Sequence, residues 1–171
     1  MTKSLQKSRV IGAAWGIIGI SLLLGTAYTR LVPHIIDAFK FGLSPLQIIV
    51  LVLWVAYMLF TEGYQGFQKN LSPRVAARMW HLVNHGRRRD LILAPIFCLG
   101  YYSSTRKRLI TTWALTIGII FIILVVSHFT EPWRGIIDVG VVLGLGYGLL
   151  WIYIYVWRTI QNRTYVVDPV I

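Results

Sequence analysis

Uncharged apolar stretches alternate with short basic segments along the whole chain. Residues 10–28 and 109–127 each run for nineteen residues without a charged side chain, and residues 136–157 are nearly as apolar. A helix of nineteen residues is about 28 Å long, which is enough to cross the hydrocarbon of a bilayer. Residues 45–62 form a fourth, shorter apolar stretch. The pattern predicts an all-α integral membrane protein, a bundle of four transmembrane helices in a single domain that covers residues 1–171.

Two prolines mark expected helix boundaries on one side of the membrane. Ser44, Pro45 and Gln47 have the spacing of a capping box with proline at the first helical position, so the second span is expected to start there. Pro33 indicates that the first span does not simply continue. Residues 29–44 are therefore expected to form an external loop.

The longest segment between spans, residues 62–108, holds nine of the seventeen Lys and Arg residues. Within it, Ser72 and Pro73 mark the expected start of a second capped helix, and residues 73–85 place basic side chains along one helical row and apolar side chains on another side. This pattern predicts an amphipathic helix that lies flat at the membrane interface. Residues 91–102 are apolar but only twelve residues long, and they contain Pro95 and Gly100. That length is typical of a re-entrant or surface segment and is too short for a span.

The distribution of charge predicts the orientation. Four spans leave fourteen of the seventeen Lys and Arg residues on one side, together with both termini and residues 62–108. Cytoplasmic segments carry the excess of basic residues in membrane proteins. We therefore expect cytoplasmic N- and C-termini in a multi-pass protein of the inner membrane. A cleaved signal peptide is the competing interpretation of residues 10–28, because Gly25 and Ala27 are small, but the apolar stretch is longer than a signal-peptide core.

Composition narrows the class of protein further. Hydrophobic residues make up 56% of the chain and charged residues 13%, and a soluble core of this size could not hide so much apolar surface. The net charge of +11 is compatible with nucleic-acid binding. However, the basic residues lie beside apolar spans and no nucleic-acid-binding motif occurs, so nucleic acid is not an expected partner. Cys98 is the single cysteine, which excludes an internal disulfide and a cysteine-based zinc site.

Anionic membrane lipid is the predicted ligand of the basic segment. Lys and Arg next to a span attract acidic headgroups, and tryptophan anchors a helix at the interface. The residues expected to bind lipid are Arg74, Arg78, Trp80, Arg87, Arg88, Arg89, Arg106, Lys107 and Arg108.

A polar pocket at the same membrane surface is the alternative site, because an ionisable residue at the end of a span often has a function. Its predicted members are Glu62, Tyr64, Gln65, Gln68, His81 and His85. The two histidines are four residues apart, as paired metal ligands are, but the chain has no HExxH motif. Their expected role is to extend the basic row, so neither a metal nor another cofactor is expected. Haem between His34 and His128 is disfavoured because His34 is expected in a loop.

Glycines spaced four residues apart predict faces where another helix approaches closely. Gly12 and Gly16 form such a face in the first span, and Gly140, Gly144 and Gly148 form a repeated GxxxG in the last. The partner of these faces could be a span of the same chain, a second copy or another membrane protein. The sequence does not choose among them. Asp138, in the last span, is expected to pair with Arg134 or Arg30 in a structural role.

The chain carries no GxSxG, no phosphate-binding glycine loop and no CxxC. The function predicted first is therefore a non-enzymatic scaffold or accessory subunit that binds anionic lipid through residues 62–108. The alternative is a small transporter or a lipid-modifying membrane enzyme with its site around Glu62, His81 and His85.

Overall fold

The computed structural model describes residues 3–164 and 167–169, and within them every regular element is helical. Four helices are long and apolar enough to cross a membrane: Gln6–Phe41, Pro45–His85, Arg106–Val126 and Trp133–Asn162. The prediction of an all-α protein with four such helices is confirmed. The parts of the expected terminal tails at residues 1–2, 165–166 and 170–171 lie outside the described residues.

Helix α1 (Lys3–Phe41) is much longer than the predicted span and includes Pro33. The expectation of an external loop over residues 29–44 is wrong, since only residues 42–44 leave the helix. Proline in a helix interior costs roughly 3 kcal/mol. The packing of this part of α1 on the start of α7 offsets that cost, because Ala38 is buried there against Gly135.

The second span continues without a break through α2 (Pro45–Met58), the π-helix η1 (Leu59–Leu71) and α3 (Ser72–His85). The capping box at its start is confirmed, with the Ser44 and Gln47 side chains each bonded to the other's backbone. The α-helix expected over residues 73–85 corresponds closely to α3, but the expected N-cap at Ser72 is wrong. Ser72 has helical backbone angles, caps nothing and is buried, because this part of the helix is packed inside the molecule.

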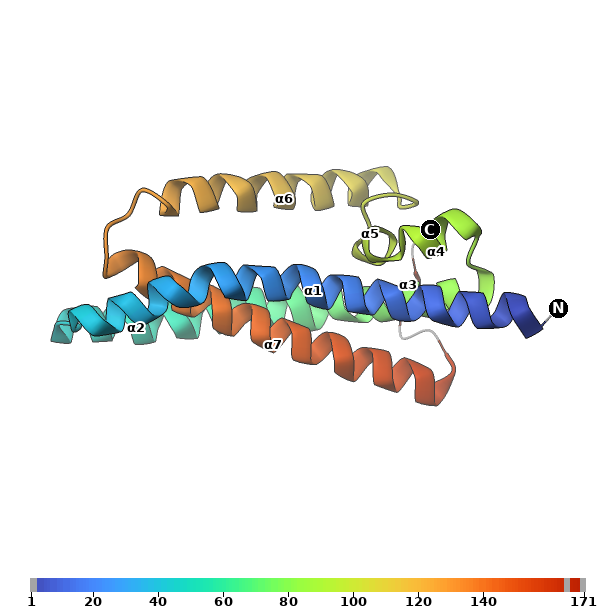
Figure 1. Cartoon of the computed structure of the whole chain (residues 1–171), viewed down its shortest axis with the longest axis horizontal. Coiled ribbons are helices and arrows are strands. Elements are labelled where there is room, and N and C mark those ends of the chain that lie inside the picture. Colours follow the sequence, from blue (N-terminus) through green and yellow to red (C-terminus); the bar gives the residue numbers. More distant parts are fainter. Residues whose placement is uncertain (1–2, 165–166, 170–171) are drawn as a thin grey trace.

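Residues 91–102 belong to a compact turn of the chain. They contain the end of α4 (Arg88–Ile92) and all of α5 (Ala94–Leu99), after which Gly100 adopts a left-handed conformation with φ of +87°. Such a conformation suits glycine because it has no Cβ. As a result, α4 and the start of α6 (Arg106–Val126) lie near the same end of the molecule (Figure 1). The segment turns the chain back and does not run the length of the bundle.

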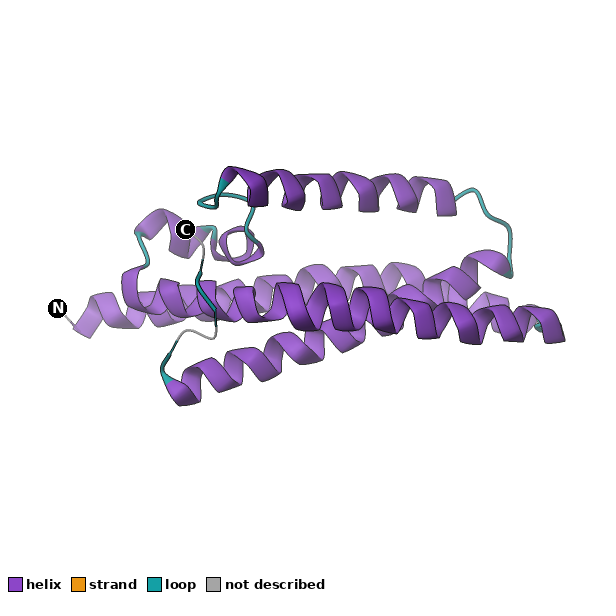
Figure 2. Ribbon diagram, turned by 180° about the vertical axis from the view of Figure 1, so that it is seen from behind, coloured by secondary structure: helices purple, strands orange, loops and turns teal. Residues whose placement is uncertain are grey.

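Three long rods form the bundle: α1, the continuous α2–η1–α3 and α7 (Trp133–Asn162) (Figure 1). The view from behind shows α6 running alongside this bundle and apart from it (Figure 2). The buried apolar cluster lies where α5 joins α1, α3 and α7, and includes Ile20, Val75, Leu82, Phe97 and Ile152.

The molecule therefore has two different ends. We call the end with α3, α4, α5, the start of α1 and the end of α7 the basic end. The end with residues 42–44 and 127–132, which connect the long helices, is the turn end (Figure 1).

Candidate functional site

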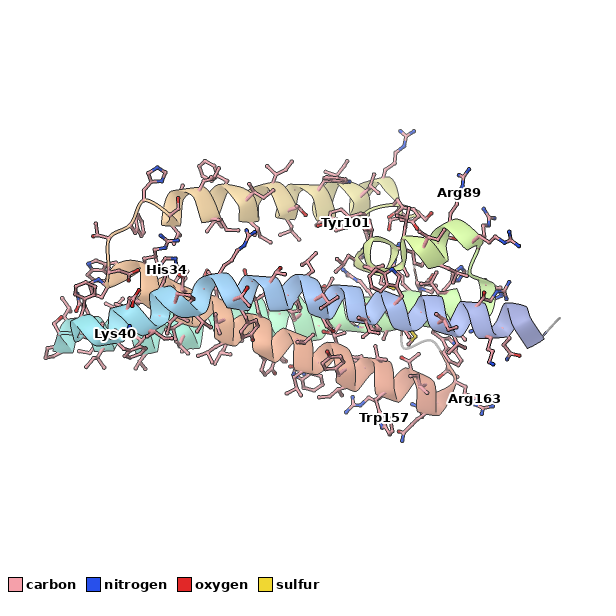
Figure 3. The ribbon with its side chains drawn as sticks, in the orientation of Figure 1. His34, Lys40, Arg89, Tyr101, Trp157 and Arg163 are labelled. Carbon is pink, nitrogen blue, oxygen red and sulfur yellow. The ribbon has the colours of Figure 1, made fainter. Side chains whose placement is uncertain are left out.

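Exposed cations from four separate segments meet at the basic end. Arg89 and Arg163 point outward from it on different sides, whereas Lys40 lies at the turn end (Figure 3). Among the residues that the structure describes, no ion pair joins any of these basic-end cations to an acid. We call this set the basic collar; its members, exposed or half-buried, are Lys7, Arg74, Arg87, Arg88, Arg89, Arg106, Lys107, Arg108, Arg158 and Arg163.

The collar differs from the predicted lipid-binding set at Arg78 and Trp80. Arg78 is only 3% exposed, so its guanidinium faces protein and not lipid headgroups. Trp80 is half-buried, as Arg74 is, and is left out of the collar only because it carries no charge. Three members of the collar, Lys7, Arg158 and Arg163, were not in the predicted lipid-binding set, although the predicted topology placed them on the same side of the membrane as residues 62–108.

Arg78 holds the end of α5 and the turn that follows. Its guanidinium donates hydrogen bonds to the carbonyl oxygens of Phe97 at 2.8 Å and Ser103 at 2.9 Å, and also to the Ser104 hydroxyl. It also stacks over the Phe97 ring, 5.1 Å from the centroid. A cation at a helix C-terminus satisfies carbonyls that lack helical partners. The role of Arg78 is therefore structural.

The N-terminal part of α1 is fastened to the basic end by two side chains. Arg9 donates to the Asn84 carbonyl oxygen at 2.5 Å, and the Trp15 indole donates to the Ile92 carbonyl oxygen at 3.2 Å. Sequence reasoning missed both contacts, since backbone carbonyls as acceptors leave no signal in the sequence. They set the position of the collar residues on α1 relative to those on α4.

The predicted polar pocket is divided between two places on one long rod. Glu62 is exposed, although a Cβ on Gly144 of α7 would lie 3.4 Å from its Cβ, and Gln68 accepts a hydrogen bond from the Tyr147 hydroxyl. Gln65 is exposed, and Tyr64 stacks on Phe60 and carries Lys69 over its ring. His81 lies nineteen residues after Glu62 in the same rod. At the rise of a helix, this places the two residues on the order of 25 Å apart. One small pocket cannot include both ends of this set.

His81 and His85 stack on each other with ring centroids 5.1 Å apart, and His81 also contacts Phe97. Nearby, the Tyr102 hydroxyl donates to Asp90 at 3.3 Å. Burial, together with the negative charge of Asp90, raises the pKa of Tyr102 to about 12. In the described part of the chain no group of three or more His, Cys, Asp or Glu side chains is placed to hold a metal ion. The arrangement anchors α4 and α5 against α3.

Cys98 lies close to these residues and packs against Gly16 of α1. Its side chain is 2% exposed, and burial raises the pKa of the thiol to about 12, although the positive charge of Arg78 acts in the opposite direction. A thiol in this state is a poor nucleophile, because the thiolate is the reactive form. Cys98 therefore packs in the core, where its burial slows its reaction with thiol reagents.

Both predicted glycine faces are occupied within the chain. On α1, a Cβ at Gly12 would meet Leu91 at 2.6 Å and one at Gly16 would meet Cys98 at 3.2 Å, so α4 and α5 cover this face. On α7, Gly140 lies against Trp54 and Gly148 lies against Phe67, so the second rod covers that face. Neither face is free for a partner protein.

At the turn end, His34 and His128 do not face each other as haem ligands would. The His34 Nδ1 lies 3.3 Å from Glu131, while the His128 Nδ1 lies 2.7 Å from the Leu124 carbonyl oxygen of the preceding helix α6. Asp138 is buried without the expected salt bridge to Arg134 or Arg30 among the described residues.

These features define the class of protein: a helical multi-pass membrane protein with one strongly basic end. No known protein family matches the chain, and neither a curated protein nor a solved structure does.

Proposed function

We propose that this protein is a non-enzymatic scaffold or accessory subunit of the inner membrane whose basic collar binds anionic lipid headgroups. One observation carries the proposal: cations from α1, α3–α4, α6 and α7 meet at one end, open to the surroundings and without acidic partners among the described residues. Cations left unpaired by the protein are available to phosphate. Each basic residue near an acidic membrane surface contributes about 1 kcal/mol of attraction.

The composition of the collar and of the adjacent surface of α1 suits a phospholipid. Most of its members are arginines, and guanidinium binds phosphate oxygens through two parallel hydrogen bonds. A shallow cavity of about 390 Å³ on α1 is lined by Gln6, Lys7, Val10 and Ile11. The ammonium and the amide suit a phosphate group, and the two apolar side chains suit the start of an acyl chain.

The collar also supports the orientation of the protein. If the basic end faces the cytoplasm, both ends of the described chain and all but three Lys and Arg residues lie on that side, as the charge rule for cytoplasmic segments requires. The anionic leaflet would then be the one in contact with the collar.

The test is retention of lipid in native mass spectrometry of the purified protein in mixed zwitterionic and anionic lipids. Wild-type protein is expected to retain anionic lipid preferentially. The variant Arg87→Gln/Arg88→Gln/Arg89→Gln is expected to lose most of that preference. A control with the same loss of charge at the other half of the molecule, Arg30→Gln/Lys40→Gln/Arg134→Gln, is expected to keep it. Equal retention of both lipid classes by the wild type would contradict the proposal.

A small transporter is the second candidate, and the π-helix favours it. Long π-helical segments are rare and single π-turns often occur at functional sites. Here η1 carries Glu62 within a membrane-length helix, next to Gly144 of α7. On this hypothesis Glu62→Gln abolishes uptake of the substrate into reconstituted vesicles without changing lipid retention. Unchanged lipid retention together with unchanged uptake would leave the scaffold as the better account.

A further inference from the structure

The turn end contains a group of ionisable side chains that the lipid-binding proposal does not use. His34 comes from α1, Glu131 from the segment before α7, and Asp138 from the second turn of α7. The His34 Nδ1 lies 3.3 Å from the Glu131 Oε1, and the other oxygen of Glu131 accepts a hydrogen bond from the Gly135 backbone N–H at 3.2 Å. The fold thus joins residues that are about a hundred positions apart.

Asp138 is the innermost member of this group and has an unsatisfied atom. It is 3% exposed, and its Oδ2 has no hydrogen-bond donor among the described residues. An ionised carboxylate in such surroundings is costly unless a donor or a cation meets it. A bound proton would remove that cost with no movement of the helices.

The ionisable groups around Asp138 come from α1, from α7 and from the segment before α7. His34, Arg134 and Glu131 are the charged or ionisable groups that act on its carboxyl group. On α1, the next ionisable residue toward the turn is Asp37, which is bonded to Lys40 at 3.2 Å, and the next in the other direction is Arg30, which is exposed. Helix α2 contributes the Trp54 indole, which donates to the Ile137 carbonyl oxygen, and its only ionisable side chain is Tyr57.

Exposure falls in order along this group toward the interior. The side chain of His34 is 30% exposed and that of Glu131 is 21% exposed, whereas Asp138 is almost fully buried. At the same end an open cavity of about 370 Å³ is lined by His128, Phe129, Thr130, Trp133 and Ile137, the last of which precedes Asp138 in the chain. Because His34 and Glu131 are the more exposed members of the group, protons from outside can reach them before they reach Asp138.

We infer that the turn end is a proton-binding site in which Asp138 takes up one proton, delivered through His34 and Glu131. The step forms one O–H bond on Asp138 and breaks either one O–H bond on a hydronium ion or one N–H bond on protonated His34, so atoms and charge are conserved. Among carboxyl groups at this end, Asp37 offers a matched control, since it is exposed and paired with Lys40.

The experiment is infrared difference spectroscopy of the purified protein in phospholipid, titrated from about pH 4 to about pH 9, a range that covers the ordinary carboxyl and imidazole values. Wild-type protein is expected to show a carboxylic C=O band of a buried group that appears as the pH falls. The band should be absent in Asp138→Asn and unchanged in Asp37→Asn. The number of protons bound per chain, measured with a pH-indicator dye, should fall by one in Asp138→Asn only.

Two results would overturn the inference. One is a wild-type spectrum identical to that of Asp138→Asn, and the other is a C=O band present at every pH without titration. If Asp138→Asn does not fold, His34→Gln carries the test. Delivery through His34 predicts that proton uptake after a rapid pH drop becomes several-fold slower in this variant, and an unchanged rate would contradict it.

Discussion

Helices α6 and α7 follow each other in the chain and are both apolar, yet they pack in opposite ways. None of the residues in α6 is buried, whereas α7 buries Gly140, Gly144, Gly148 and Ile152 against the other two rods. The contrast shows most clearly in their glycines. A Cβ added to Gly118 of α6 would meet nothing within 4 Å, but one added to Gly148 of α7 would collide with the Phe67 ring. Apolar composition is sufficient for a span, and small residues on one face decide whether that span packs.

The isolation of α6 is not costly in a bilayer, because lipid tails are as apolar as its side chains. Near the middle of the helix, α6 contacts Tyr101, whose hydroxyl lies 2.8 Å from the Thr116 hydroxyl and whose ring meets Trp113 edge to face. Arg78 holds the residues between Tyr101 and α6. The position of α6 therefore depends on the contacts of Tyr101 and Arg78, while the position of α7 depends on packing along its whole length.

The largest expected effect on stability comes from removing the hydrogen bonds that Arg78 donates. In Arg78→Met the carbonyl oxygens of Phe97 and Ser103 lose charged donors, and each such hydrogen bond is worth roughly 1.5–3 kcal/mol. We expect the free energy of unfolding in detergent to fall by about 4 kcal/mol. Arg74→Met is the control, since Arg74 is half-buried and bonds to Asn70 at 3.3 Å. An equal loss of unfolding free energy in the two variants would show that the hydrogen bonds of Arg78 do not stabilise the turn before α6.

The second largest effect is expected from matched glycine substitutions in α7 and α6. Gly148→Leu forces α7 away from Phe67 and is expected to lower the free energy of unfolding by about 3 kcal/mol, the upper range for overpacking. Gly118→Leu is the matched change on α6 and should have almost no effect, because its surroundings are open. Thermal unfolding of both variants in the same detergent is the measurement. A large loss in Gly118→Leu would mean that α6 packs against a partner.

A smaller effect is expected at the contact between Tyr101 and α6. Thr116→Val removes the hydrogen bond to Tyr101 and should cost about 1 kcal/mol or less. The sharper readout is the distance between spin labels on α6 and α1, whose distribution should broaden in this variant. Thr111→Val is the control, because the Thr111 hydroxyl bonds only to the Lys107 carbonyl oxygen of its own helix. A distribution that stays narrow would show that other contacts hold α6.

The smallest expected effect is the pH dependence of stability that comes from the buried Cys98 thiol. The fold raises the pKa of its thiol to about 12, whereas an unfolded cysteine ionises near 8.5. The thiol's contribution to stability is therefore fully present below about pH 8.5 and is lost as the pH rises through about 12. Maleimide labelling at about pH 8 should be slow in the wild type. It should be several-fold faster in Arg78→Met, which loosens α5. Fast labelling of the wild type would contradict the burial of Cys98.

Sequence reasoning was most accurate where a local rule applied and least accurate where packing overrode one. The capping box at Ser44 depends only on neighbouring residues and is present as expected. Pro33 and the Ser72–Pro73 pair looked like helix boundaries for equally local reasons, but long rods packed side by side carry the helix through both. For the same reason the predicted polar pocket was too large, since Glu62 and His81 lie far apart on one straight rod.

Hydropathy and the placement of charge are properties of short stretches of chain, so the sequence by itself determined that this is a helical membrane protein with four long apolar helices and a basic segment between the second and third. Burial of a particular polar group depends on residues far away in the chain. Only the tertiary structure decided that Arg78 meets backbone carbonyls in the interior while its basic neighbours stay exposed, and that His34 and Glu131 lie beside a buried Asp138. The physical reason is that a charged side chain has the same sequence signature whether it faces lipid, water or protein, and its environment depends on which helices pack around it.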